Sequence, residues 1–177
     1  ALDIFGERGF HATSMNDLAE AAGVTKPVLY QHFSSKRELF LELLAEIGAD
    51  LSSVIAKATV DQSSTRQQLE HGFDAYFAWV DDNRAAFDLL FSAGTRREPD
   101  FLAAAHRVED AIADLVADNI VISGLTRERR VLLAHGIVGM AGRRFPRLPG
   151  RDRLTDGIDV KARDGGIEID LHVIVEY

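Results

Sequence analysis

Apolar side chains recur every three or four residues over most of the chain, which is the period of an amphipathic α-helix. The clearest run consists of Leu69, Phe73, Tyr76, Phe77 and Val80. Further runs with this period extend over residues 101–116 and 131–138. We therefore predict that residues 49–142 are helical, with a break at residues 81–83 and a loop at residues 94–99.

The amino-terminal part of the chain carries shorter apolar runs with sharp start and stop signals. Ser14, followed three residues later by Asp17, has the spacing of a capping box at the start of a helix. Gly23 suits the left-handed turn that ends a helix, and Pro27 suits the first turn of the next one. A helix, a tight turn and a short helix over residues 14–33 form the arrangement of a helix-turn-helix.

Near the carboxyl end of the chain the apolar period changes from helical to alternating. Every second side chain is apolar in residues 158–162 and 167–177, as in a half-buried β-strand. The sequence Asp164-Gly165-Gly166 between them is a hairpin-type turn signal. We therefore predict an all-α fold with a β-hairpin appended at its carboxyl end.

Composition removes several classes of site. The chain has 177 residues and no cysteine, which excludes disulfide scaffolds, thiolate zinc sites, iron–sulfur clusters and cysteine nucleophiles. A reducing, cytoplasmic location fits this composition. The apolar runs are well short of the roughly 20 residues that a membrane-spanning helix needs. Ala1 already lies within a predicted helix, so we expect that the natural chain begins earlier.

The polar residues favour neither metal binding nor catalysis. His71, His106 and His135 lack the HxxxH and HxxE spacings of metal sites. The acidic pairs at residues 81–82 and 109–110 are typical of solvated helix faces and caps, and neither a nucleophile nor a glycine-rich phosphate loop accompanies them. We therefore predict that the chain is not an enzyme and uses no cofactor.

The net charge of −8, taken alone, argues against a nucleic-acid partner. The charges are unevenly distributed, however. Lys26, Lys36 and Arg37 lie in or beside the second helix of the helix-turn-helix, and acidic residues are absent between Gly23 and Arg37. An acidic chain can therefore still present a basic docking face.

Residues 1–44 resemble the DNA-binding domain of the TetR family of transcriptional regulators. The residues that carry the resemblance are Phe5, Gly9, Phe10, Thr13, Ser14, Leu18, Ala19, Ala22, Gly23, Val24, Leu29, Tyr30, His32, Phe33, Lys36, Leu39 and Phe40. More loosely, the resemblance continues to residue 142. It implies a helix-turn-helix DNA-binding domain at residues 1–47 that lacks its start, a helical effector-binding and dimerisation domain at residues 48–142, and an atypical tail at residues 143–177.

The resemblance also implies a function. A homodimer would bind double-stranded DNA at a near-palindromic operator, with its recognition helices in successive major grooves, and a small-molecule effector would release this repressor. The implied DNA contacts are Ser14, Thr25, Lys26, Pro27, Val28, Tyr30, His32 and Lys36. Among them we expect Lys26 to contact a base or a phosphate, Val28 a thymine methyl group, and Lys36 a phosphate.

The aromatic residues of the predicted helices gain a second interpretation from the resemblance. An aromatic stripe at helical spacing usually belongs to the core. Family members bind small effectors between these helices, however. We therefore predict a pocket for an apolar or aromatic effector at Phe73, Tyr76, Phe77, Phe91 and His106.

The tail leaves two interpretations open. Residues 156–177 resemble the end of an alkaline-shock-protein family domain, and a lone hairpin has edges that invite pairing with a second chain. The tail is therefore either a genuine appendage or a fused or frame-shifted end. An alternative function is a protein-interaction module that assembles through this hairpin and carries a vestigial helix-turn-helix.

Overall fold

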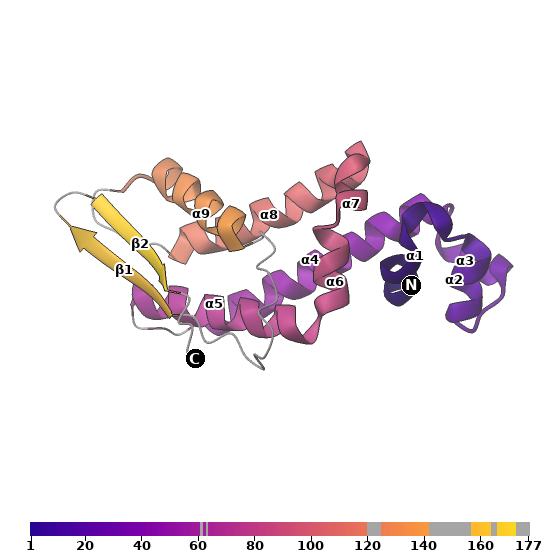
Figure 1. Cartoon of the computed structure of the whole chain (residues 1–177), viewed down its shortest axis with the longest axis horizontal. Coiled ribbons are helices and arrows are strands. Elements are labelled where there is room, and N and C mark those ends of the chain that lie inside the picture. Colours follow the sequence, from indigo (N-terminus) through magenta and orange to yellow (C-terminus); the bar gives the residue numbers. More distant parts are fainter. Residues whose placement is uncertain (61, 63, 120–124, 142–156, 164–165, 173–177) are drawn as a thin grey trace.

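The computed structural model describes residues 1–60, 62, 64–119, 125–141, 157–163 and 166–172. Three short helices form an amino-terminal unit, termed the head: α1 (Leu2–Ala12), α2 (Met15–Ala21) and α3 (Lys26–His32). Helix α4 (Lys36–Thr59) leaves the head and runs along the molecule (Figure 1). The first turn of α4 is bonded to the head through Lys36 and is counted with it. The rest of α4 and the remaining helices form the helical body: α5 (Thr65–Asp82), α6 (Arg84–Leu90), α7 (Ala93–Arg97), α8 (Pro99–Asn119) and α9 (Arg127–Ala141).

Two strands follow the helices and lie at the end of the molecule opposite the head (Figure 1). Strands β1 (Gly157–Arg163) and β2 (Gly166–His172) pair in an antiparallel register that sets Gly157 opposite His172. Up to residue 141, the described elements are thus all α-helices, as the periodicity predicts. The other residues of the predicted tail, 142–156, 164–165 and 173–177, lie outside the described residues.

The helix-turn-helix forms because both ends of its first helix are fixed locally. Ser14 Oγ accepts a hydrogen bond from the Asp17 N–H at 3.2 Å, and Asp17 Oδ2 accepts one from the Ser14 N–H at 2.8 Å, which confirms the capping box. Gly23 follows α2 with φ of +66°, a conformation that side chains with a Cβ rarely adopt. The chain then turns into α3, where Pro27 lies in the first turn.

One apolar core continues from the head into the helical body. The Phe5 and Phe40 rings meet edge to face with their centroids 4.9 Å apart, and the Phe40 and Phe101 centroids are 4.5 Å apart. Phe10 of α1 also packs against Phe101, at 4.7 Å. Since Phe40 belongs to α4 and Phe101 to α8, the head and the helical body share this aromatic cluster.

Helix α4 is held closely on both sides. A Cβ atom at Gly48 would collide with Val108, so glycine allows α4 to approach α8. On the other side, the Trp79 indole Nε1 of α5 donates to Asp50 Oδ2 of α4 at 2.6 Å. These contacts make α4 the element around which the helical body packs.

The predicted loop at residues 94–99 is wrong, because most of it is the short helix α7. Ser92 Oγ accepts from the Thr95 N–H at 3.0 Å and caps the helix, and the buried Thr95 Oγ1 donates to the Leu89 carbonyl at 2.7 Å. A second finding concerns the predicted domain boundary after residue 47. Helix α4 runs through it without a break, so the two predicted domains share a helix.

Candidate nucleic-acid interface and cavities of the helical body

Helix α3 presents a row of exposed side chains. Leu29 is its buried residue and anchors it to the head. The predicted DNA contacts that lie exposed on α3 or directly before it are Thr25, Lys26, Pro27, Val28, Tyr30 and His32. Val28 and Tyr30 are 38% and 45% exposed, which is high for large apolar side chains. Both side chains are therefore accessible to a partner.

Lys26 lies at the first position of α3. Its Nζ is 5.9 Å from the centre of the Tyr30 ring, so the cation and the phenol lie on the same side of the helix. Among the residues that the structure describes, acidic side chains form no ion pair with Lys26. Its ammonium is therefore available to an external base or phosphate.

Two other predicted DNA contacts are engaged within the head. Lys36 Nζ donates to the carbonyls of Phe10 and Thr13 at 2.7 and 2.6 Å, and it lies 4.4 Å from the centre of the Phe10 ring. The lysine thereby ties the start of α4 to the end of α1, and one of its three donors remains for a phosphate. Ser14 Oγ donates to Asp17 Oδ2 at 2.6 Å.

Arg37 is the third cation that the sequence places beside α3, and it turns toward the helical body. Its guanidinium donates to Asp100 at the start of α8 and to Glu98, which lies between α7 and α8. Of the three cations, Lys26 is therefore the one that makes no hydrogen bond or ion pair with another described residue.

A small cavity lies among α4, α5, α8 and α9. It has a volume of about 40 Å³, and its walls are almost entirely apolar. Phe73 and Tyr76, two of the five predicted effector residues, line it together with Ile55, Gly72 and Ile112. Burial, with a smaller contribution from the negative charge of Glu109, raises the pKa of the Tyr76 phenol, so this group stays neutral.

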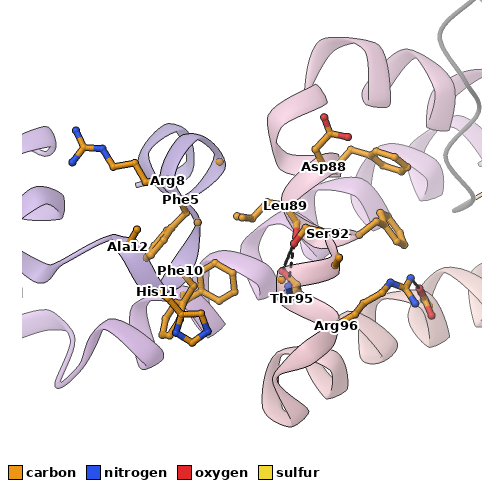
Figure 2. Close-up of a pocket in the computed structure, with 18 of the residues that line it drawn as sticks. Phe5, Arg8, Phe10, His11, Ala12, Asp88, Leu89, Ser92, Thr95 and Arg96 are labelled. Carbon is orange, nitrogen blue, oxygen red and sulfur yellow. Dashed lines mark hydrogen bonds and ion pairs between the residues drawn. The ribbon is translucent and has the colours of Figure 1, made fainter.

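A much larger cleft of about 950 Å³ lies beside the contact between α1 and α6 and extends to α7 (Figure 2). Aromatic rings including Phe5, Phe10 and Phe91 line it, and charged groups including Arg8 and Arg96 lie around it. Arg96 pairs with Glu109 of α8 at 2.9 Å. The cleft therefore lies at the joint between the head and the helical body.

The structure divides the five residues predicted to hold an effector. Phe73 and Tyr76 line the small cavity, and Phe91 lines the cleft. Phe77 is half-buried beside Tyr76 and lines neither space, and His106 is exposed on α8. The aliphatic walls of the small cavity could not be predicted from the sequence. Aliphatic residues that line a cavity recur at the same helical spacing as ordinary core residues.

Within the described residues, His, Asp and Glu side chains do not gather in threes where a metal ion could be held. His135 Nδ1 lies 3.9 Å from Asp110 Oδ1, and His71 is exposed. The described helices include none with the length and apolarity to cross a bilayer.

The chain is similar to bacterial regulators in sequence. Residues 1–43 match the model of bacterial regulatory proteins of the tetR family. The HTH-type transcriptional activator FasR of Mycolicibacterium smegmatis is 35% identical over 145 residues, which cover 80% of this chain and 65% of FasR. The HTH-type transcriptional repressor KstR2 of Rhodococcus jostii is 31% identical over 86 residues, which cover 49% of this chain and 42% of KstR2.

The fold is similar to solved structures as well. A TetR-like transcriptional regulator from Rhodococcus sp. RHA1 matches with a TM-score of 0.64 and 28% identity, over 80% of this chain and 75% of that one. The fold and the exposed α3 define a helix-turn-helix protein. Residues 1–43 therefore belong to the tetR family of bacterial regulatory proteins, and the chain as a whole is similar to TetR-family transcriptional regulators in sequence and fold. It spans just under two thirds of the length of FasR and less than half of the length of KstR2.

Proposed function

We propose that the chain is a transcriptional regulator that binds operator DNA through α3. The observation that carries the proposal is the exposed face of α3, where Lys26, Val28 and Tyr30 are accessible while Leu29 is buried. A helix fits the major groove of B-DNA, which is about 12 Å wide. Lys26 would donate to a base edge or a phosphate, Val28 would pack on a thymine methyl group, and Tyr30 and His32 would contact phosphates.

The binding form that we propose is a cytoplasmic homodimer on a near-palindromic operator. Two copies of α3 would then enter successive major grooves about 34 Å apart. Repression is the regulatory sign that we propose, and the name of KstR2 supports it, whereas the name of FasR supports activation. Transcription from the regulated promoter should rise when the chain is deleted, and a fall would show activation instead.

An apolar effector held between the helices of the body would control this binding. The apolar walls of the small cavity at Phe73 and Tyr76 support an aliphatic or aromatic ligand. A cavity of about 40 Å³ is far smaller than the roughly 300–1,000 Å³ of ordinary ligand sites. The effector would therefore part the surrounding helices, and it would act by binding one arrangement of head and body more tightly than the other.

DNA binding is tested with the fragment upstream of the chain's own gene. Fluorescence anisotropy at two salt concentrations would compare the full chain with Lys26→Ala and with the control Lys57→Ala, an exposed lysine near the end of α4. We expect Lys26→Ala to weaken binding about tenfold, as loss of one base or phosphate contact does. Lys57→Ala should leave the affinity unchanged. Equal affinities for all three proteins would overturn the assignment of α3.

A further inference from the structure

A cluster of charged side chains joins the head to the helical body at the start of α4. Arg37 Nε and Nη2 donate to Asp100 Oδ2 at 2.9 and 2.7 Å, and Nη1 donates to Glu98 Oε2 at 3.4 Å. The other Glu98 oxygen lies 3.4 Å from Nε2 of His11, in α1. Glu98 and Asp100 lie at the junction of α7 and α8, so this corner is linked to α1 through His11 and to the first turn of α4 through Arg37.

The guanidinium of Arg37 is also held by stacking. Its central carbon lies 4.9 Å from the centre of the Phe101 ring, which packs in turn against Phe40 and Phe10. Arg37 is thus fixed by a forked hydrogen bond on its edge and a ring on its face, a combination that lysine cannot reproduce. The hydrogen bond to Asp100 raises the pKa of Arg37, so the cation stays charged.

The position of this cluster determines what it can restrain. The cleft of about 950 Å³ lies beside the contact between α1 and α6, and His11 lies on its wall (Figure 2). The head is therefore not closely packed on the whole of this side, and a tilt about the α1–α6 contact has space in the cleft. The charged cluster spans from α1 and α4 to the α7–α8 corner, so a tilt of the head has to break it.

We propose that Arg37, Glu98 and Asp100 form a clamp that sets the angle of the head on the helical body. Resting on the proposed function, the clamp would set the separation of the two α3 helices in a dimer, and hence the half-site spacing that the regulator accepts. These residues touch no DNA in this role and act as positioning residues. One base pair changes the half-site separation by about 3.4 Å, so a modest tilt is sufficient to change the preferred spacing.

The clamp should affect the angle of the head and have little effect on global stability. Arg37 is 40% exposed and Asp100 is 61% exposed, and exposed ion pairs contribute little to global stability. Removing the clamp should therefore leave the melting temperature nearly unchanged while the head becomes free to tilt. A residue with a merely structural role would change the melting temperature and leave the angle of the head unaffected.

The absence of cysteine makes the angle of the head directly measurable. Cysteines introduced at the exposed Glu20 of α2 and Arg107 of α8 would carry spin labels, and dilution with unlabelled chain would isolate distances within one chain. In the doubly substituted Glu98→Gln, Asp100→Asn protein, we expect the mean distance to shift or its distribution to broaden. The matched control is Glu70→Gln, which removes an ion pair with Arg66 within α5. An unchanged distribution in the clamp variant would overturn the proposal.

Selection from a library of operators with varied half-site spacing tests the consequence for DNA. The unmodified chain should enrich one half-site spacing over the others. In the clamp variant this enrichment ratio should fall about fivefold, a factor that corresponds to the free energy of one ion pair. Unchanged spacing preference despite a mobile head would overturn the role in specificity. If the chain bound no DNA in the anisotropy assay, the proposed function would fail while the spin-label distances would still test the clamp.

Discussion

Lys26 and Lys36 are the same residue type, yet their surroundings differ. Lys26 starts α3 on an exposed face, whereas the ammonium of Lys36 is held between two backbone carbonyls and an aromatic ring. The sequence analysis places Lys26 at the start of the second helix of the helix-turn-helix, and the structure shows its side chain exposed there. The sequence could not show the internal bonds of Lys36, because Phe10 and Thr13 are far from it along the chain.

Replacing Lys36 with methionine tests whether this lysine stabilises the head. Lys36→Met keeps the apolar stem and removes the two hydrogen bonds to the Phe10 and Thr13 carbonyls. We expect the free energy of unfolding to fall by about 1.5–3 kcal/mol, the range for hydrogen bonds to a charged group. Urea denaturation measures this loss. Lys57→Met, at an exposed position near the end of α4, should stay within about 0.5 kcal/mol of the parent protein.

The phosphate role that the family resemblance implies makes a different prediction for the same variant. A lysine that contacts phosphate would lower DNA affinity on removal and reduce the salt dependence by about one ion. Unchanged stability together with a reduced salt slope would therefore contradict the internal role of Lys36. Lost stability with an unchanged salt slope would contradict the phosphate contact.

At the scale of elements, local capping explains which helices could be predicted. The serine and aspartate at the start of α2 are three residues apart, and this spacing alone identifies the helix start. Helix α7 was missed because Gly94 suggested a loop, and the stabilising bond from Thr95 reaches back to the Leu89 carbonyl. A helix of one turn that depends on such a bond lacks the apolar period that identifies longer helices.

The stabilisation that the capping box gives to the amino-terminal end of α2 should depend on pH. Hydrogen bonds from the Ser14 side chain and backbone lower the pKa of Asp17 below its ordinary value of 3.8. A lowered pKa in the folded state means that this stabilisation is complete above the ordinary pKa. It is lost as the pH falls through the lower, folded-state value. We therefore expect the difference in melting temperature between the parent protein and Asp17→Asn to shrink below about pH 4.

Ser14→Ala provides the matched comparison for this pH dependence. It removes the side-chain partner of Asp17 and should cost about 1 kcal/mol at neutral pH, as loss of an N-cap does. In the Ser14→Ala background, Asp17→Asn should have a smaller effect, and its pH dependence should weaken. An effect of Asp17→Asn that is the same with and without the Ser14 side chain would show that the two residues do not act together.

At the scale of the whole molecule, the cavity and the cleft are formed by distant parts of the chain. The small cavity combines walls from α4, α5, α8 and α9, and the cleft combines α1 with α6, α7 and α8. Periodicity identifies which face of each helix is buried, but it does not show which faces meet. The aromatic residues predicted to form one pocket therefore divide between two spaces, and the aliphatic residues that complete the small cavity could not be distinguished from core.

Filling the small cavity should uncouple the molecule from an apolar effector. A Cβ atom at Gly72 would lie 3.2 Å from Thr59 Cγ2 and 3.8 Å from Ile55 Cγ2, so a leucine side chain there would occupy the cavity. The probes are the straight-chain alcohols from 1-hexanol to 1-dodecanol. We expect the melting temperature of the parent protein to rise with alcohol chain length, because a ligand that binds the folded state stabilises it by mass action. In Gly72→Leu this rise should disappear.

Gly136→Leu separates filling of the cavity from the general effect of adding leucine to a helix. Gly136 lies exposed on α9, where an added Cβ would meet nothing within 4 Å, so this variant should keep the full response to the alcohols. Overpacking at Gly72 costs about 1–3 kcal/mol, so each response is measured relative to the melting temperature of the same variant without alcohol. Trp79 of α5, which is the single tryptophan of the chain, gives an independent fluorescence signal beside the cavity helices. Equal responses from Gly72→Leu and Gly136→Leu would show that the alcohols bind elsewhere and would contradict an effector site at Phe73 and Tyr76.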